Sequence, residues 1–307
     1  ILPMVVYDHY GAVQQGELTG RITLLVHGLC MNHLTWSTRK YGGIGEKLLA
    51  QRDHNTMLYL NYNTGRRISA NGRSLSNTLE DLVQRNPGIT SIDLIGHSMG
   101  GLVSRSALFY GKQNMHGWIH RVENLVCLGS PHHGAVLERI GFALQKHLGR
   151  IPLGKIVGHI ANIRSNGILD LRYGSVRDDD WEHNDVRIGL MDDNRKPAPI
   201  PSHINAYLVA GTIEFGSRKN RTLQVIGDYL VSVKSALGEH PNPRYQLKVP
   251  DAHKAIFYGV NHFEIQHHPQ VAEQIVHWFY PNDEDEQCNQ IHEYITDLKS
   301  MEGIALT

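Results

Sequence analysis

Short apolar runs recur through the first half of the chain, and amphipathic stretches separate them. Leu75–Arg85 repeats its apolar residues at helical spacing until Pro87 interrupts the pattern, and Met99–Tyr110 predicts a second helix. Strands that alternate with helices are typical of a parallel sheet with helices on both faces, so the pattern predicts an α/β fold. The predicted strands of this half are Arg21–Val26, Asn55–Leu60, Ser91–Ile95 and Val122–Leu128.

The alternation stops after Gly134. Val136–Leu148 predicts an amphipathic helix, and glycine-broken apolar, acidic and proline-rich segments follow it. The sheet pattern then resumes, with predicted strands at Ile204–Ala210 and His253–Tyr258 and a last clear helix at Val271–Phe279. We therefore predict a single α/β core made of residues 1–135 and 204–307, with residues 136–203 inserted over the sheet as a cap or lid.

Composition supports a globular protein with a sizeable core, since 41% of the 307 residues are apolar and 20% are charged. Thirty basic residues balance thirty acidic ones, so bulk electrostatics gives no reason to expect nucleic acid or an anionic membrane as a partner. The 20 histidines make the net charge strongly pH-dependent below about pH 6.5.

The three cysteines are Cys30, Cys127 and Cys288, and their spacing fits no zinc or redox motif. Cys127 lies in an apolar run and is expected to be a buried thiol. No run of about 18 apolar residues occurs, so we expect no transmembrane segment. The chain begins at Ile1 without an initiator Met, and the sequence leaves its compartment open, with a soluble cytoplasmic protein favoured over a secreted one whose signal segment has been removed.

The clearest chemical signal is Gly96-His97-Ser98-Met99-Gly100, which fits G-x-S-x-G. An apolar strand precedes it and a helical pattern follows, as a nucleophile on a sharp strand-to-helix turn requires. Glycines two positions before and after Ser98 remove the side-chain bulk that such a strained turn excludes. Ser98 is therefore the candidate nucleophile.

Attack by serine needs two N–H donors where negative charge develops on the substrate. The backbone N–H of Met99, directly after the nucleophile, is one candidate. His27-Gly28-Leu29 follows the first predicted strand, so the backbone N–H of Leu29 is the other.

In this fold the catalytic residues follow the chain order nucleophile, acid, histidine. His262 comes directly after the last predicted strand and is the candidate base. His267 and His268 compete with it, but they lie beside Pro269, where the final helix begins. His253 and His240 precede the strand and are expected to be surface or packing residues.

The acid is expected in the region after the strand Ile204–Ala210. Asp228, beside Gly227 and before a helical stretch at Val233–Leu237, is the candidate, and Glu214 is the alternative. Asp251 lies too close to the last strand. The acid would fix the tautomer of the histidine and stabilise its charged form.

These motifs together resemble bacterial lipases and esterases of the α/β-hydrolase superfamily, especially the GPI inositol-deacylase-like (PGAP1-like) group. The resemblance covers residues from about 20 to 280 apart from the cap. It rests on His27-Gly28-Leu29, Tyr62–Arg66, Gly96–Gly101, Gly129–Gly134, Gly227-Asp228 and Asn261-His262. It implies hydrolysis of carboxylic esters without a cofactor.

The chain departs from the group at Tyr229, where many relatives have glycine, and at Ser232, where many have proline. These departures leave the shape of the acid loop open. No aspartate pattern supports the calcium that some bacterial lipases hold. We expect no metal in the acidic stretch around Asp178-Asp179-Asp180, because this stretch, with His183, Asp185, Asp192 and Asp193, has no recognisable ligand spacing. His132-His133 are expected in a loop beside the site and not as metal ligands.

The sequence thus predicts a serine carboxylic-ester hydrolase that acts on apolar acyl esters or lipids through an acyl-enzyme. An acyltransferase or thioesterase with the same three residues is the alternative, and a non-catalytic binding protein on the same fold is a third hypothesis. The amphipathic Val136–Leu148 would suit a lid over an acyl chain, or a cap that only packs on the sheet. The sequence leaves the acyl length, the alcohol and the oligomeric state open.

Overall fold

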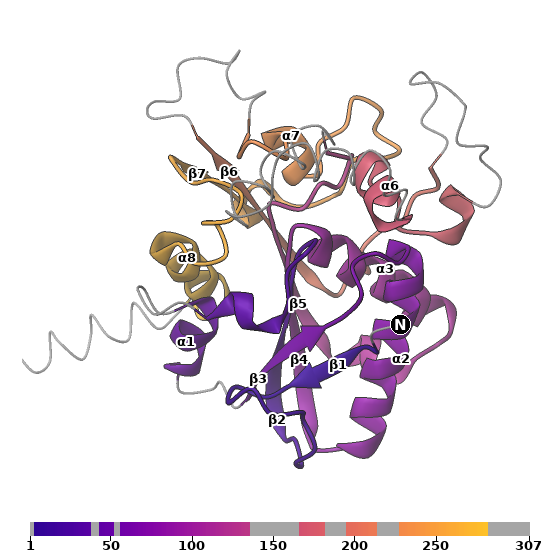
Figure 1. Ribbon diagram of the computed structural model, residues 1–307, viewed down its shortest axis with the longest axis vertical. Coiled ribbons are helices and arrows are strands. Elements are labelled where there is room, and N and C mark those ends of the chain that lie inside the picture. Colours follow the sequence, from indigo (N-terminus) through magenta and orange to yellow (C-terminus); the bar gives the residue numbers. More distant parts are fainter. Residues whose placement is uncertain are drawn as a thin grey trace, which may run out of the picture.

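One seven-stranded sheet, in the order β1-β3-β2-β4-β5-β6-β7, forms the centre of the molecule (Figure 1). The computed structural model describes residues 3–37, 43–51, 56–135, 166–181, 195–213 and 227–281. Only the edge strand β1 runs antiparallel; every other neighbouring pair is parallel, as an α/β fold requires. The strands are β1 (Val5–Tyr7), β2 (Gly20–Val26), β3 (Thr56–Asn61), β4 (Ile89–His97), β5 (Val122–Leu128), β6 (Asn205–Thr212) and β7 (Lys254–Tyr258).

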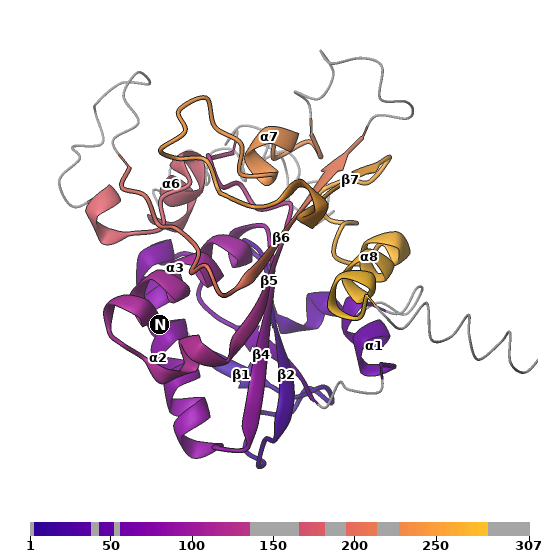
Figure 2. The same ribbon diagram turned by 180° about the vertical axis from the view of Figure 1, so that it is seen from behind.

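Helices cover both faces of the sheet. Both views place α2 (Ile68–Arg85) and α3 (Met99–Gln113) on one side, and α1 (Ile44–Leu49) and α8 (Pro269–Phe279) on the other (Figures 1 and 2). The helices α6 (Asn166–Tyr173) and α7 (Val233–Ala236) lie near each other at one end of the sheet in both views. The predicted mostly parallel α/β fold is thereby confirmed.

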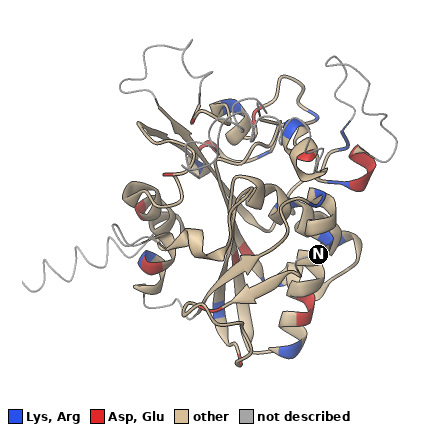
Figure 3. Cartoon of the chain, viewed as in Figure 1, with Lys and Arg blue, Asp and Glu red and all other residues tan. Residues whose placement is uncertain are grey.

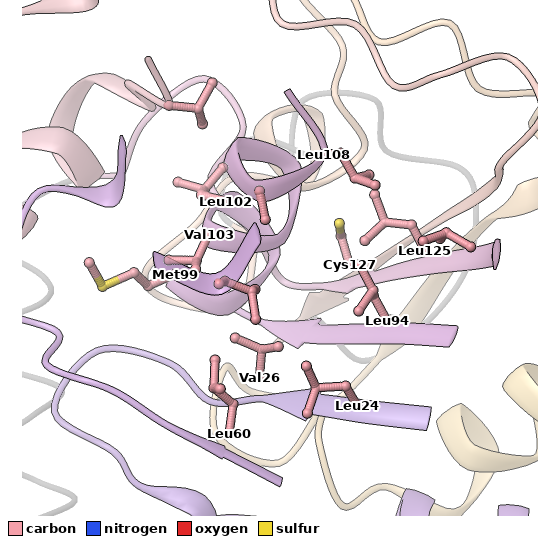
Figure 4. Packing of buried hydrophobic residues seen from close by; sticks show 14 of the residues in the cluster. Leu24, Val26, Leu60, Leu94, Met99, Leu102, Val103, Leu108, Leu125 and Cys127 are labelled. Atoms are coloured by element: carbon pink, nitrogen blue, oxygen red, sulfur yellow. The ribbon is translucent and has the colours of Figure 1, made fainter. Parts of the chain in front are cut away.

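The period of two along each strand separates two apolar cores. In β2, Ile22, Leu24 and Val26 join the cluster under α2 and α3, while Leu25 joins the cluster under α1 and α8. Figure 4 shows the first cluster, where strand side chains meet those of α3 and where the thiol of Cys127 is buried. Charged residues of both signs are interspersed along the ribbon, apart from the three aspartates of the turn Asp178–Asp180 (Figure 3).

A row of polar side chains crosses the buried sheet. Asp93 in β4 is fully buried, accepts a hydrogen bond from the Asn124 amide at 2.7 Å and lies 3.4 Å from the Thr23 hydroxyl. Arg21 Nε lies 3.6 Å from the Asp93 carboxylate. Burial outweighs these partners and raises the pKa of Asp93 to about 6.

The helix α2 begins at Ile68, so the expected start at Leu75 is wrong. Asp170 of α6 accepts from the Ile68 N–H at 2.8 Å and from Arg67 at 2.7 Å, and this carboxylate caps a helix about a hundred residues earlier in the chain. A cap from so distant a residue leaves no local sequence signal.

Several expectations fall where the structure says nothing. Val136–Leu148, Glu214 and Cys288 lie outside the described residues. Of the expected cap, 166–181 and 195–203 are described. Among the helices in the described ranges, none is both long enough and apolar enough to cross a membrane.

We predict that Asp93 makes stability fall as pH rises from about 4 to about 6. The folded state, with the higher pKa, binds the proton more tightly than the unfolded chain, so ionisation disfavours folding. The wild type should lose about 2–3 kcal/mol relative to Asp93→Asn across this window. Urea unfolding of both proteins at several pH values measures it; a difference that is constant, or that grows in favour of the wild type, would contradict the burial argument.

We also predict that Gly72→Ala destabilises the protein by about 1–3 kcal/mol through overpacking. A Cβ at Gly72 would lie 2.2 Å from Ser106 Oγ, where α2 meets α3. Helix propensity alone would instead favour alanine by about 1 kcal/mol, so the sign separates the two effects. Gly117→Ala is the control, because a Cβ there meets nothing closer than a Glu80 oxygen at 3.7 Å. The free energies of unfolding are measured in urea. An equal value for Gly72→Ala and the wild type would contradict close packing of α2 against α3 at this position.

Candidate active site

Ser98 sits at the sharp turn between β4 and α3, with φ 53° and ψ −120°. The turn leaves no room for side chains beside it: a Cβ at Gly96 would lie 2.4 Å from the Gly101 nitrogen, and one at Gly100 would lie 2.1 Å from the Val26 carbonyl oxygen. The glycines are therefore required by close backbone contact, as the motif predicts. The side chain of Ser98 stays 8% exposed.

His262, in the loop after β7, reaches both of its expected partners. Its Nε2 lies 2.9 Å from Ser98 Oγ, and its Nδ1 lies 2.7 Å from Asp228 Oδ2. A carboxylate only accepts hydrogen bonds, so we assign the ring proton to Nδ1, which leaves Nε2 free to accept the serine hydroxyl proton. The structure thus brings together the three side chains that the sequence selected from far apart in the chain.

Asp228 is held by its own tight loop. Its Oδ1 accepts from the backbone N–H groups of Leu230 at 3.1 Å and Val231 at 2.9 Å, which leaves Oδ2 to His262. Gly227 and Tyr229 both have positive φ, at 59° and 83°. Tyr229 thus adopts a conformation that suits glycine, and its side chain projects into solvent. Ser232 caps α7 by accepting from the Ser235 N–H at 3.2 Å.

The sequence did not identify the role of His97, the residue before the nucleophile. Its ring is buried and donates from Nε2 to the backbone carbonyl of His262 at 2.8 Å. Burial holds the pKa of His97 well below its usual range, so the ring stays neutral. His97 therefore fixes the backbone that carries the candidate base. The available signal in the sequence for this role was the position of His97 inside the G-x-S-x-G motif.

The turn after β2 packs directly against the nucleophile. A Cβ at Gly28 would lie 3.1 Å from Ser98 Cβ. The Tyr62 hydroxyl donates to the His27 carbonyl at 2.7 Å, and the two rings stack 4.4 Å apart, which secures the turn. Within the described ranges, no hydrogen bond uses the backbone N–H of Leu29 or of Met99, the first residue of α3.

Four of the competing residues, His253, His240, Asp251 and His268, have other places in the fold. His253 contacts the Ala206 carbonyl at 3.2 Å, and His240 contacts the backbone of Asn242. Asp251 pairs with Lys254 at the surface. His268 precedes α8 as its N-cap residue.

A third glycine brings backbone against the acid and base. Gly129, at the end of β5, has φ 56°, and a Cβ there would lie 3.0 Å from Asp228 Oδ2 and 3.3 Å from His262 Nδ1. The loop that follows it lines a small pocket at Ser98. Most of the other lining side chains are apolar, namely Leu29, Met31, Pro131, Ala135, Leu171, Leu230, Val231 and Phe263.

In the described part of the chain, no group of three or more His, Cys, Asp or Glu side chains is placed to hold a metal ion. The aspartates of the acidic stretch that are described have other partners. Asp178 pairs with Arg73, Asp179 with Arg177 at 2.6 Å, and Asp180 accepts from backbone N–H groups. His183, Asp185, Asp192 and Asp193 lie outside the described residues.

Comparison with known families gives one match over most of the chain. The family model described as the PGAP1-like alpha/beta domain matches residues 17–240. This range includes the turn at His27, the nucleophile motif and Asp228, and it ends before His262. A search of curated proteins gave no match.

Two solved structures were compared with the chain. The mature lipase BlEst2 of Bacillus licheniformis superposes with a TM-score of 0.53 at 19% identity, covering 90% of this chain and 97% of the lipase chain. The naproxen esterase of Bacillus subtilis gives a TM-score of 0.48 at 14% identity, with 90% and 87% covered. At 19% identity the likeness to the B. licheniformis lipase concerns the fold alone.

We predict that Gly129→Ala slows labelling of Ser98 by a fluorophosphonate about tenfold or more. The added methyl would push the Asp228 carboxylate and the His262 ring aside by a few tenths of an ångström. A misplacement of about 1 Å costs about a hundredfold in rate, so a smaller shift is expected to cost less than that. Mass spectrometry of the labelled serine, followed in time, measures the rate.

Gly11→Ala is the matched control for this substitution. Gly11 also has positive φ, at 81°, but a Cβ there meets nothing within 4 Å. Both substitutions thus carry backbone strain, and only one crowds the site. Equal labelling rates in the two variants would show that Gly129 is not needed for the contact between acid and base.

Proposed function

The chain belongs to the PGAP1-like α/β-domain family, and from this premise we propose that it is a serine carboxylic-ester hydrolase, an esterase or lipase. The observation that carries the proposal is the line of hydrogen bonds from Ser98 Oγ through His262 to Asp228, at 2.9 and 2.7 Å. This geometry is that of a serine nucleophile with its general base and the acid that orients it. The structural neighbour from B. licheniformis is a lipase, which is consistent with the proposal.

In the first step, Ser98 Oγ attacks the ester carbonyl carbon while His262 Nε2 takes the hydroxyl proton. The carbonyl π electrons move to oxygen, and the backbone N–H groups of Leu29 and Met99 are the proposed donors to that oxyanion. When the C–O bond to the alcohol breaks, His262 returns the proton to the leaving oxygen. The products are an acyl-serine ester and a free alcohol.

In the second step, His262 takes a proton from water, and the hydroxyl oxygen attacks the acyl carbon. The bond to Ser98 Oγ breaks, and the proton passes from His262 to the serine oxygen. The carboxylic acid leaves and the enzyme is restored. Asp228 keeps the imidazole in the tautomer that both steps need and stabilises the imidazolium, without taking a proton itself.

The apolar lining of the pocket at Ser98 favours an apolar acyl group. We propose that residues 136–203 form a cap over this pocket. Two contacts of the described part support this. Leu171 of α6 lines the pocket, and its carbonyl accepts from the Ala135 N–H at 3.1 Å.

We predict that Ser98→Ala abolishes hydrolysis of p-nitrophenyl butyrate and leaves the circular dichroism spectrum unchanged, because the substitution removes the attacking oxygen from a site that the backbone shapes. Ser104→Ala is the control, since among the described residues the hydroxyl of this buried α3 serine donates within its own helix, to the Gly100 carbonyl at 2.9 Å. Asp228→Asn should lower kcat by about 10³–10⁴, because the amide favours the wrong tautomer. Turnover retained by pure Ser98→Ala protein would reject the proposal.

Rates on p-nitrophenyl esters from acetate to palmitate, and on emulsified triglyceride, then distinguish esterase from lipase. Product analysis with added alcohol or thiol acceptors separates hydrolysis from acyl transfer. A larger yield of transfer product than of acid would replace the hydrolase by the acyltransferase.

A further inference from the structure

A second pocket, of about 410 Å³, lies beside the site and has no part in the proposed chemistry. Its wall combines Arg105 of α3, the loop residues His132 and His133, the segment 195–200 and the segment 243–248. The loop 129–135 contributes to both pockets: Pro131 and Ala135 line the one at Ser98, and the two histidines line this one.

Arg105 is a buried cation whose attractive charge partner among the described residues, Asp180, forms no direct ion pair with it. It is 7% exposed, and it donates to His132 Nδ1 at 3.2 Å and to the Ala198 carbonyl at 3.0 Å. No carboxylate among the described residues forms an ion pair with it, and its Nε has no hydrogen-bond partner there. Burial lowers the pKa of Arg105 to about 10, which leaves it charged at neutral pH. Buried charges are normally paired, so this arrangement is incomplete as it stands.

His132 presents a second unused donor. Its Nδ1 must accept the hydrogen bond from Arg105, so the hydrogen of the neutral ring lies on Nε2. Burial holds the pKa of His132 well below its usual range, and this ring is 1% exposed. No described atom accepts from Nε2. Two residues that line one pocket thus each carry a buried donor without an acceptor among the described residues, which costs free energy unless a ligand supplies oxygen atoms.

The other charged side chains of the lining are basic except for Asp180. Arg195, Lys196, Arg244 and Lys248 add four cations, of which Lys196 already pairs with Asp179 at 3.3 Å. The acidic residue in the described lining is Asp180, whose carboxylate accepts from the backbone N–H groups of Val176, Arg177 and Lys196 at 2.9 to 3.0 Å. Its charge is thus already engaged by the protein.

We propose that this pocket binds the phosphate group of a small molecule. A phosphate offers several acceptor oxygens and up to two negative charges, which match unused donors set among clustered cations. A neutral or donor-rich ligand would leave both buried N–H groups unpaired. The group could come from a free phosphate compound or from the alcohol part of an ester bound at Ser98, and the chemistry recognised is the same.

Titration calorimetry with inorganic phosphate, at ionic strength kept constant with chloride, tests the site. We expect saturable binding to the wild type and equally to Ser98→Ala, so this result does not depend on the proposed hydrolase activity. Arg244→Gln/Lys248→Gln should weaken binding about tenfold or more. Arg85→Gln/Lys112→Gln removes two exposed cations away from the pocket and should bind as the wild type does.

Arg105→Met should abolish binding, and the exposed pair decides the matter if that variant does not fold. Heat no larger than a chloride blank, or equal affinity in the two double variants, would overturn the proposal. Hydrolysis of a neutral ester and of one with a phosphate on its alcohol then identifies the source of the group. If inorganic phosphate inhibits hydrolysis of the phosphorylated ester but not of the neutral ester, the phosphate group belongs to the substrate. If phosphate binds but changes neither hydrolysis rate, the pocket binds a separate phosphate compound.

Discussion

The backbone of Ser98 stands at φ 53° and ψ −120°, a sparsely populated conformation that costs an L-residue about 1–3 kcal/mol, and the rest of the site is arranged around it. The parallel sheet makes the conformation tolerable, because β4 and α3 pack into place before and after the turn and the Ser98 N–H bonds to the Leu128 carbonyl of β5 at 2.8 Å. The strain points the hydroxyl away from the strand toward His262. A flat connection would leave the same serine inside the core.

Much of this was predictable because it depends on local patterns. Apolar runs predicted the parallel strands. The glycines around Ser98 predicted the turn, because a Cβ at either position would lie within 2.4 Å of a backbone atom. His262 followed from its position after the last strand, and Asp228 from its turn. The order of these elements along the chain determines which strand ends meet. The contact between Ser98 and His262, which are 164 positions apart, was therefore predictable from the sequence.

What the sequence left out depends on contacts between distant segments. Asp170 caps the first turn of α2, and this distant residue leaves no local signal in the sequence. Gly72 lies within α2 where α3 packs too closely for a side chain, so this glycine reads in the sequence as a helix breaker. The edge strand β1 has three residues, too few to show a period. His97 resembled a spacer within the motif, and only the fold shows that its ring bonds to the His262 carbonyl.

The loop 129–135 links the two pockets, and its restraints suggest how they interact. Gly129 donates to the Val209 carbonyl at 2.8 Å and the His133 N–H to Ser235 Oγ at 3.1 Å, so both halves are tied to the core. A ligand alters a distant site only when it binds two arrangements unequally. With the loop held in this way, an anion beside Arg105 should influence which substrates bind across both pockets more than the reactivity of Ser98 itself.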